Sequence, residues 1–271
     1  MKAADLFNVS GKTTIVTGGA SGIGYACAEV MAENGARVTL MDVDPAALDR
    51  AVGTLKAKGD VRGVVLDVTD RPALRQAFTD TAGHYGRLDV VFANAGISGG
   101  PGFLKFDRSR NEERAIENMP DEHVDRIVGL NYVSIFATIQ AAVPHMKASG
   151  GGRIIVTGSI STVMPEVFVA STYVMSKAGL PQLVRQAAIE LVKYNILVNA
   201  MGPGPFVTNI GGGRLKEPDN QAFFAKNSPM HRMGQTDDIQ GLALFLASPA
   251  SAYITGQQVM IDGGVTLGVA D

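Results

Sequence analysis

The stretch Thr13-Thr14-Ile15-Val16-Thr17-Gly18-Gly19-Ala20-Ser21-Gly22-Ile23-Gly24 decides the fold of this chain. Apolar and β-branched residues lead into glycines at 18, 22 and 24, and apolar residues then recur at helical spacing, which predicts a strand, a tight turn and a helix. Glycine lets the backbone turn sharply and approach a ligand closely, while the free N–H groups at the helix start favour an anion. The unit is typical of a phosphate-binding turn.

Asp42 supports this interpretation. It follows the next apolar run, 38–41, and lies 18 residues after Gly24. A carboxylate at about 20 residues from such a turn meets the ribose hydroxyls of a dinucleotide. A glycine turn alone would be weak support, because any tight connection from strand to helix favours glycine. The turn and the carboxylate together predict a dinucleotide site.

Composition bounds the class of protein. The 271 residues are 46% hydrophobic and 18% charged, with a formal net charge of −2. These values favour one well-buried α/β domain over residues 1–271, and they give no reason to expect binding to nucleic acid or to an anionic membrane. The four histidines have no metal-ligand spacing, so we expect no metal. Cys27 is expected in the core, and the absence of a signal-like segment makes the cytoplasm the default location.

Strands and helices are predicted to alternate along the chain. After the opening unit, further strands are expected at 61–66, 88–93, 153–157, 196–201 and 258–261, and helices at 45–58, 71–85, 121–149, 172–192 and 236–247, with an interruption at Pro144. Apolar strands separated by helices imply a parallel sheet covered on both faces. Such sheets place ligands at the carboxyl ends of their strands.

Two long connections interrupt this alternation. Residues 98–120 include the charged run 107–114, with three acidic residues and three arginines, and we interpret them as a solvated insert. Residues 202–232 combine prolines and the triplet Gly211-Gly212-Gly213 with apolar side chains, which suits a mobile lid over a substrate. A surface excursion or a subunit contact is the alternative for this second connection.

Tyr173 and Lys177 lie four residues apart, so they share one face of a predicted helix. A nearby ammonium favours the phenolate form of tyrosine, and we therefore expect Lys177 to lower the pKa of Tyr173. Ser159 lies two residues after the strand 153–157, where its hydroxyl could hold a substrate oxygen; Ser161 is the competing candidate. A tyrosine and a lysine at this spacing are common on surface helices, so these residues need the wider context.

Asn131 lies in an otherwise apolar helical run, 127–133. A buried amide must find hydrogen-bond partners, and those expected here are a carbonyl four residues earlier or a bound water. From the residues alone we favour a core asparagine whose amide is satisfied locally.

Five motifs together resemble the short-chain dehydrogenase/reductase family: the turn from Thr17 to Gly24, Asn94-Ala95-Gly96, Ser159, the pair Tyr173 and Lys177, and Pro203-Gly204. The resemblance runs from about residue 9 to residue 264. It implies a single-domain Rossmann-type, doubly wound α/β fold with seven parallel strands and helices on both faces. It also implies a homotetramer.

The resemblance assigns roles to residues. Tyr173 would be the general acid/base, Lys177 would lower its pKa and hold the nicotinamide ribose, Ser159 would position the reacting oxygen, and Asn131 would anchor a proton-relaying water. The positions that match the cofactor site are Gly18, Ser21, Gly22, Ile23, Gly24, Asp42, Asp67, Val68, Asn94, Ala95, Gly96, Tyr173, Lys177, Pro203, Gly204, Phe206 and Thr208.

Three positions depart from the family pattern. Ala93 replaces the first asparagine of the usual Asn-Asn-Ala-Gly motif, Gly158 replaces the first residue of a common serine pair, and Phe206 replaces an aliphatic residue beside the nicotinamide. None of these changes removes a catalytic group. They make the shape of the pocket harder to predict.

The resulting hypothesis is an NAD-dependent enzyme that interconverts a secondary alcohol and a ketone. Asp42 would accept bonds from both ribose hydroxyls and repel a 2′-phosphate, and neither Ser21 nor Val43 supplies a compensating charge. Glu166 could bind hydroxyls, which suggests a polyol, sugar or small cyclic alcohol. The alternatives are an apolar alcohol, steroid-like or an aromatic dihydrodiol, and a non-catalytic nucleotide-binding regulatory protein.

Overall fold

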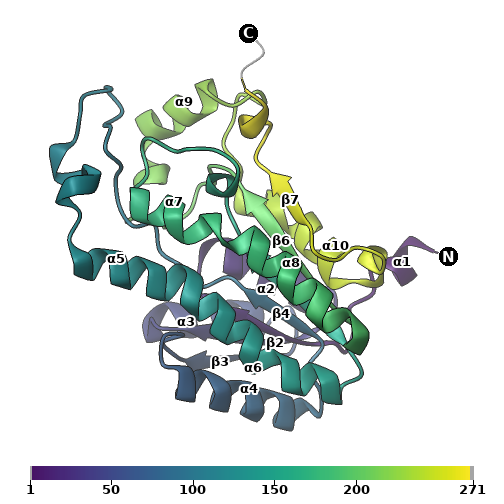
Figure 1. The fold of residues 1–271 in the computed structure, drawn as a ribbon. Helices are drawn as coiled ribbons and strands as arrows, with labels where there is room; N and C mark the ends of the chain where they lie inside the picture. Colours follow the sequence, from purple (N-terminus) through teal and green to yellow (C-terminus); the bar gives the residue numbers. More distant parts are fainter. Residues whose placement is uncertain (1, 269–271) are drawn as a thin grey trace.

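A computed structural model describes residues 2–268. Seven strands, all parallel, form one sheet in the order β3-β2-β1-β4-β5-β6-β7 (Figure 1). Their bounds are β1 Thr13–Thr17, β2 Arg37–Asp42, β3 Val61–Val65, β4 Val90–Ala93, β5 Gly152–Thr157, β6 Ile196–Pro203 and β7 Gln258–Ile261. This architecture confirms the predicted doubly wound parallel sheet.

Helices cover both faces of the sheet (Figure 1). One core contains side chains of α4 (Arg71–Tyr85), α6 (Ser134–Ala148) and α8 (Leu180–Leu191), and the other contains those of α2 (Gly22–Glu33), α3 (Pro45–Leu55) and α10 (Gln240–Ala247). Successive strand residues alternate between the two cores, as Val91 and Phe92 of β4 do. Because both faces are buried, the central strands are apolar throughout.

The direction of winding reverses between β1 and β4. The chain builds β1, β2 and β3 toward one edge and then returns to place β4 on the other side of β1. In open α/β sheets, the loops that follow two such strands diverge and leave a crevice at their carboxyl ends. The glycine turn follows β1 at this point, and Asn94 follows β4.

The predicted helix 121–149 is interrupted in a different place from the one expected. It consists of α5 (Asp121–Val128), a π-helical turn over Gly129–Val133, and α6, and Pro144 lies inside α6 without ending it. The carbonyl that Pro144 leaves without a partner belongs to Gln140, which is exposed, so water can serve it. By length and composition alone, Asp121–Ala148 could cross a membrane, but half of its most apolar window is buried inside the protein.

The two long connections also contain regular structure. The insert 98–120 forms two 3₁₀ turns, Glu112–Arg114 and Ile116–Asn118, and pairs through Pro101 with Val169. The segment 202–232 begins within β6 and includes α9 (Pro218–Lys226). All three residues of the glycine triplet 211–213 have positive φ angles, from +68° to +80°. Such angles favour glycine, which explains the triplet.

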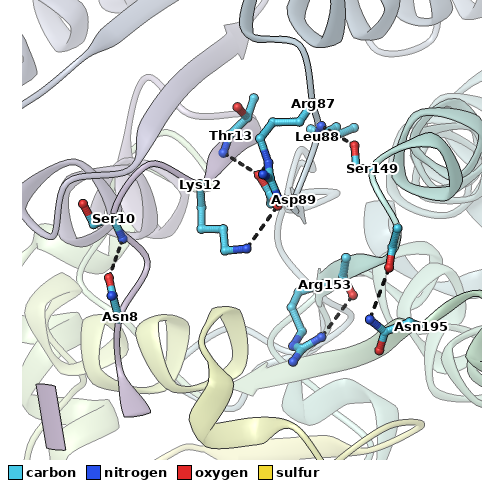
Figure 2. A network of polar contacts seen from close by, with 12 residues as sticks. Asn8, Ser10, Lys12, Thr13, Arg87, Leu88, Asp89, Ser149, Arg153 and Asn195 are labelled. Atoms are coloured by element: carbon cyan, nitrogen blue, oxygen red, sulfur yellow. Dashed lines mark hydrogen bonds and ion pairs between the residues drawn. The ribbon is translucent and has the colours of Figure 1, made fainter. Parts of the chain in front are cut away.

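A network of charged residues closes the amino ends of the central strands (Figure 2). Asp89, which precedes β4 and is 6% exposed, accepts hydrogen bonds from the Thr13 amide at 3.0 Å and from Arg87 Nε at 2.7 Å, and Lys12 Nζ lies 3.3 Å away. Burial opposes ionisation of Asp89, but the bonds from Arg87 and Thr13 outweigh it, so the pKa of the carboxyl is lower than usual. Asp89 therefore joins the starts of β1 and β4.

Candidate active site

A cleft of about 1270 Å³ opens at the carboxyl ends of the strands, beside the reversal between β1 and β4. Sites for one small molecule usually measure about 300–1,000 Å³, so this cleft has room for a dinucleotide and a second ligand. The residues predicted to bind the cofactor all line it: Gly18, Ser21, Gly22, Ile23, Gly24, Asp42, Asp67, Val68, Asn94, Ala95, Gly96, Tyr173, Lys177, Pro203, Gly204, Phe206 and Thr208. Ser159 lines it too.

The glycine turn needs glycine at each of its three positions. Gly18 and Gly22 have φ angles of +64° and +56°, and a Cβ on Gly24 would collide with the carbonyl oxygen of Gly18. Ser21 stands at the N-cap of α2, but its hydroxyl caps no amide among the described residues. The first amides of α2 therefore lie next to the cleft without a side-chain cap, which suits the phosphates of a dinucleotide.

Asp42 ends β2 with its carboxylate held in place. Oδ2 accepts a hydrogen bond from the Ala20 amide at 3.0 Å, and Oδ1 accepts one from the Asp44 amide at 3.1 Å. A carboxylate oxygen can accept more than one bond, so the group retains acceptor capacity toward a ligand. The structure thus presents a fixed acceptor to the cleft at the position where the sequence predicts contact with a ribose.

Asn94 joins three strand ends. Its Nδ2 donates to the carbonyls of Thr17 and Gly18 at 3.0 and 3.1 Å, and its Oδ1 accepts from Thr157 Oγ1 at 2.9 Å. The neighbouring Ala93 is fully buried at the end of β4, where its small side chain is part of the core. Alanine at position 93, in place of the family's usual asparagine, therefore does not weaken the glycine turn, because Asn94 makes the bonds that hold it.

Asn131 lies on the π-helical turn, fully buried, and is the one predicted catalytic residue that does not line the cleft. Its Oδ1 accepts from the amide of Ile97, and its Nδ2 donates to the carbonyl of Ile97, both at 2.8 Å. Nδ2 also donates to Ser176 Oγ at 3.2 Å. The protein partners differ from the expected carbonyl four residues earlier: the amide holds the loop after β4 against α7 (Ser171–Ala178).

Tyr173 and Lys177 both project from α7 into the cleft, as the helical spacing predicts. Lys177 is 4% exposed, and its Nζ donates to the Thr157 carbonyl at 2.8 Å, at the end of β5. The same Nζ lies 5.9 Å from the centre of the Tyr173 ring. The Ser159 hydroxyl lies close enough to the phenol of Tyr173 to lower its pKa. The three predicted groups are therefore gathered at one place.

The expectation that Lys177 lowers the pKa of Tyr173 is wrong for the chain by itself. Burial is the largest influence, and the pKa of Tyr173 is raised to about 12. The nearby Ser159 hydroxyl lowers this pKa, and the charge of Glu166 raises it further. Burial lowers the pKa of Lys177 to about 8. Desolvation disfavours the charged form of both groups, and the ammonium is bound to the Thr157 carbonyl instead of the phenol.

A row of hydroxyls leads from Tyr173 to a carboxyl group. Ser159 Oγ lies 2.9 Å from Ser161 Oγ, and Ser161 in turn donates to Glu166 Oε2. The two serines that competed as candidates therefore occupy different places: Ser159 lies beside Tyr173, and Ser161 donates to Glu166. Burial raises the pKa of Glu166, and the bond from Ser161 only partly offsets this.

Phe206 is the third departure from the family pattern, and its ring has room because the residue beside it, Gly234, has no side chain. It is 4% exposed and pairs with Gly234, where a Cβ would lie 2.8 Å from the phenylalanine ring. Thr208, two residues on, lies near the glycine turn, with its side chain 3.5 Å from the position of a Cβ on Gly22. The segment after β6 thus reaches across the cleft to the start of α2.

An aromatic cluster that the sequence did not predict forms one wall. Phe106 of the insert lies 5.4 Å from Phe168 and 5.7 Å from Phe224 of α9, measured between ring centres. Phe223 lies 5.0 Å from Phe168. The insert is therefore not only a solvated excursion, because it meets the lid beside the cleft. The phenylalanines at 106, 168, 223 and 224 were the available signal, but the sequence did not specify which of them would meet.

The cleft lies at the reversal of a parallel sheet, is large enough for a dinucleotide and is lined by a glycine turn. It also holds a tyrosine beside a serine and a lysine. These features define a nucleotide-binding α/β protein with acid/base groups. Comparisons extend this class. A family model described as enoyl-(acyl carrier protein) reductase matches residues 18–266. The 2,5-dichloro-2,5-cyclohexadiene-1,4-diol dehydrogenase LinX of Sphingobium indicum is 35% identical over 266 residues, covering 96% of this chain and 98% of that protein.

Solved structures agree. A short-chain type dehydrogenase/reductase from Mycobacterium marinum is similar with a TM-score of 0.87 and 34% identity, covering 98% of this chain and 99% of that one. A 7α-hydroxysteroid dehydrogenase complexed with NADH and 7-oxo glycochenodeoxycholic acid has a TM-score of 0.86 and 30% identity, covering 100% and 99%. The chain belongs to the short-chain dehydrogenase/reductase family, oxidoreductases that use a nicotinamide cofactor. Other similar structures hold NADP, so the fold alone does not select between the two cofactors.

Proposed function

We propose that this protein is an NAD-dependent oxidoreductase that interconverts a secondary alcohol and a ketone. The observation that carries the proposal is the meeting of Tyr173, Ser159 and Lys177 in the cleft that the glycine turn lines. A bound oxidised nicotinamide would accept the hydride that leaves the carbinol carbon. Tyr173 would take the hydroxyl proton, and Ser159 would hold the oxygen as it becomes a carbonyl. No metal takes part in this scheme.

The state of Tyr173 fits proton donation at neutral pH. With a pKa of about 12 in the free protein, the phenol is protonated and can supply the proton that a ketone needs on reduction. For alcohol oxidation the same group must first lose that proton. We propose that Lys177 assists and holds the nicotinamide ribose, and that Asn131 anchors a water through which protons pass to solvent, although its side-chain amide is already engaged by Ile97 and Ser176.

The preference for NAD rests on Asp42. Its carboxylate is fixed by two backbone amides at the edge of the cleft, where it would accept bonds from ribose hydroxyls and repel a phosphate. Ser21 and Val43 also line the cleft near this place, and neither carries a positive charge. NADP would therefore be bound against an uncompensated negative charge.

We propose a polyol, sugar or small cyclic alcohol as substrate. Ser161 and Glu166 provide polar groups beyond Ser159, and the relative LinX is named as a dehydrogenase of a cyclic diol. The second candidate is an apolar alcohol, steroid-like or an aromatic dihydrodiol, which the wall of Phe106, Phe168 and Phe224 favours. A non-catalytic nucleotide-binding protein is the remaining alternative, and turnover would exclude it.

The test is an alcohol panel run with each cofactor. Sugars, polyols, cyclohexanols and steroid alcohols are supplied with NAD or NADP, and the absorbance of the reduced cofactor is followed. The proposal predicts turnover of at least one secondary alcohol, faster with NAD. Absence of turnover throughout, with dinucleotide binding retained, would leave the regulatory alternative in its place.

We also propose a homotetramer. Apolar side chains project outward from the helices that cover one face of the sheet: Ile189 of α8 is 78% exposed and Phe136 of α6 is 50% exposed. Burial of such side chains between subunits would remove apolar surface from water. Light scattering should give a mass near four times 28.4 kDa, and a monomer mass would contradict the proposal.

A further inference from the structure

Glu166 is a carboxyl group that lines the cleft with much of its hydrogen-bonding capacity free. Ser161 donates to its Oε2, and among the described residues no hydrogen bond reaches its Oε1. The residue is half-buried, and it lies within the cleft rather than on the outer surface. A carboxyl in this position has room for a donor that comes from a ligand.

The presence of this carboxyl opposes the chemistry proposed for its neighbour. The negative charge of Glu166 raises the pKa of Tyr173 and so hinders ionisation of the phenol. Burial also makes the ionised form of Glu166 itself costly. A carboxyl group that carries these two costs and still lines the cleft indicates that it interacts with a ligand there. A hydrogen bond donated by that ligand would offset part of both.

The surroundings of Glu166 define the shape of that ligand. Along one side runs the polar row from Tyr173 through Ser159 and Ser161 to Glu166, in which one serine separates the group at the reacting oxygen from the carboxyl. Phenylalanine rings line the same cleft, at Phe106, Phe168 and Phe224. A ring with two oxygens along one edge matches both features, because its oxygens can bond to the polar row and its apolar face can pack on a phenylalanine.

We propose that Glu166 determines specificity by accepting a hydrogen bond from a second hydroxyl on the substrate ring, so that the substrate is a cyclic alcohol bearing at least two hydroxyls. This inference rests on the proposed function. The reacting hydroxyl contacts Ser159 and Tyr173, and the other hydroxyl donates to Glu166, which Ser161 orients. A hydroxyl can donate to the carboxyl in either protonation state. An ammonium would require the ionised form, which burial disfavours.

The test compares probes that share one six-membered ring: cis-cyclohexane-1,2-diol, cyclohexanol and 2-aminocyclohexanol. Values of kcat/KM are measured with saturating NAD for the wild type, Glu166→Gln and Glu166→Leu. Because a polar group left without a hydrogen-bond partner in a buried site costs about 1–3 kcal/mol, we expect the wild type to prefer the diol over cyclohexanol by about 5- to 100-fold. In Glu166→Leu the two values should become similar, and Glu166→Gln, which keeps an acceptor oxygen, should lie between.

Glu113→Gln is the matched control. Glu113 lies exposed on the insert, outside the cleft, so its substitution should leave the diol preference as in the wild type. Thermal unfolding of each variant shows whether the fold is intact. Equal use of diol and cyclohexanol by the wild type, an unchanged ratio in Glu166→Leu, or a preference for the amino alcohol would each overturn the inference. Turnover of cyclohexanol in those cases would leave the proposed function standing, whereas no turnover of any alcohol would remove both.

Discussion

The two ends of the same sheet treat buried charge in opposite ways. At the amino ends, the carboxylate of Asp89 has an amide and two cations as partners, and its pKa is lowered (Figure 2). At the carboxyl ends, Lys177 has a carbonyl as its only protein partner among the described residues, and burial shifts its pKa toward the neutral form. Strand β4 begins after Asp89 and ends before Asn94, whose Oδ1 accepts from Thr157 Oγ1 at the end of β5, the residue whose carbonyl holds Lys177.

This difference separates stability from function. A buried charge with a full set of partners holds strands together, and removing one partner is costly. A buried charge with few partners destabilises the folded chain and is retained for another purpose, which at a sheet's carboxyl edge is ligand chemistry. Charge burial alone therefore does not mark a site; the lack of partners does.

Replacing Lys177 with methionine should produce the largest effect and move activity and stability in opposite directions. Lys177 is proposed to hold the nicotinamide ribose, and misplacing a reactant can cost about 10²-fold, so we expect kcat/KM to fall by about 10²-fold. Burial lowers the pKa of Lys177 from 10.5 to about 8, which corresponds to a loss of about 3 kcal/mol in the free energy of unfolding at pH 7. The bond from Lys177 to Thr157 contributes about 1 kcal/mol of stability, and the methionine variant loses it. Chemical denaturation at pH 7 should therefore show a gain of about 2 kcal/mol. A clear loss of stability would contradict the contrast between the two ends.

Replacing Asp89 with alanine should destabilise the protein without touching the cleft. The change leaves the Thr13 amide without its acceptor and removes the bonds of Arg87, so we expect a loss of about 3 kcal/mol in the free energy of unfolding. The loss should be present above the ordinary carboxyl pKa and disappear as the pH falls through the lowered native value, where Asp89 is protonated.

Glu112→Ala is the control for Asp89→Ala. It breaks a surface ion pair with Arg110, in which both side chains are more than half exposed, and should hardly change the denaturation midpoint. If the two variants lose similar stability, the amino-end network has no special role.

Replacing Asp42 with asparagine should alter cofactor choice. Asparagine keeps an acceptor for the Ala20 amide but removes the negative charge, so the ratio of kcat/KM with NAD to that with NADP should fall by about tenfold or more. Asp44→Asn is the matched control, since Asp44 lies two residues away, exposed and outside the cleft. A ratio that does not change in Asp42→Asn would argue against the proposed preference for NAD.

A pH titration of stability gives the smallest expected effect and tests the lowered pKa of Lys177 itself. Because the native pKa is about 8 and the unfolded one 10.5, the unfolded chain holds more protons between these values, and the stability of the wild type rises with pH there. The advantage of Lys177→Met should therefore shrink by about 1 kcal/mol between about pH 7 and pH 9. If the stability difference between Lys177→Met and the wild type stays constant with pH, the pKa of Lys177 is not lowered in the folded protein.

The sequence predicted those parts of the fold that short-range signals determine. Helix 71–85 and strand 258–261 have the predicted bounds. The helix begins after Asp70, whose side chain accepts from the Ala73 amide, and ends at Gly86 with a φ angle of +75°. Such caps are local and can be read from the residues. The alternation of strands and helices predicted a parallel sheet with its ligand site at the carboxyl ends of the strands, and the family resemblance predicted the doubly wound order.

The features that were missed depend on contacts between distant segments. The π-helical turn holds Asn131, whose amide bonds Ile97, 34 residues away. The wall of the cleft depends on Phe106 meeting Phe168. The raised pKa of Tyr173 depends on how deeply the fold buries it and on the nearby Glu166, neither of which the spacing of Tyr173 and Lys177 reveals. Local pattern located the candidate groups, and only tertiary structure gave their environment.

The most direct measurement is the rate of hydride transfer in Tyr173→Phe, with a secondary alcohol that the wild type oxidises and with saturating NAD. This change removes one hydroxyl from the ring and nothing else, so dinucleotide affinity, followed by fluorescence titration, should stay close to that of the wild type. We predict a fall in the rate of about 10³-fold, because the proton would have no acceptor. A variant that binds the dinucleotide and still oxidises the alcohol at nearly the wild-type rate would contradict the assignment of Tyr173 and the mechanism built on it.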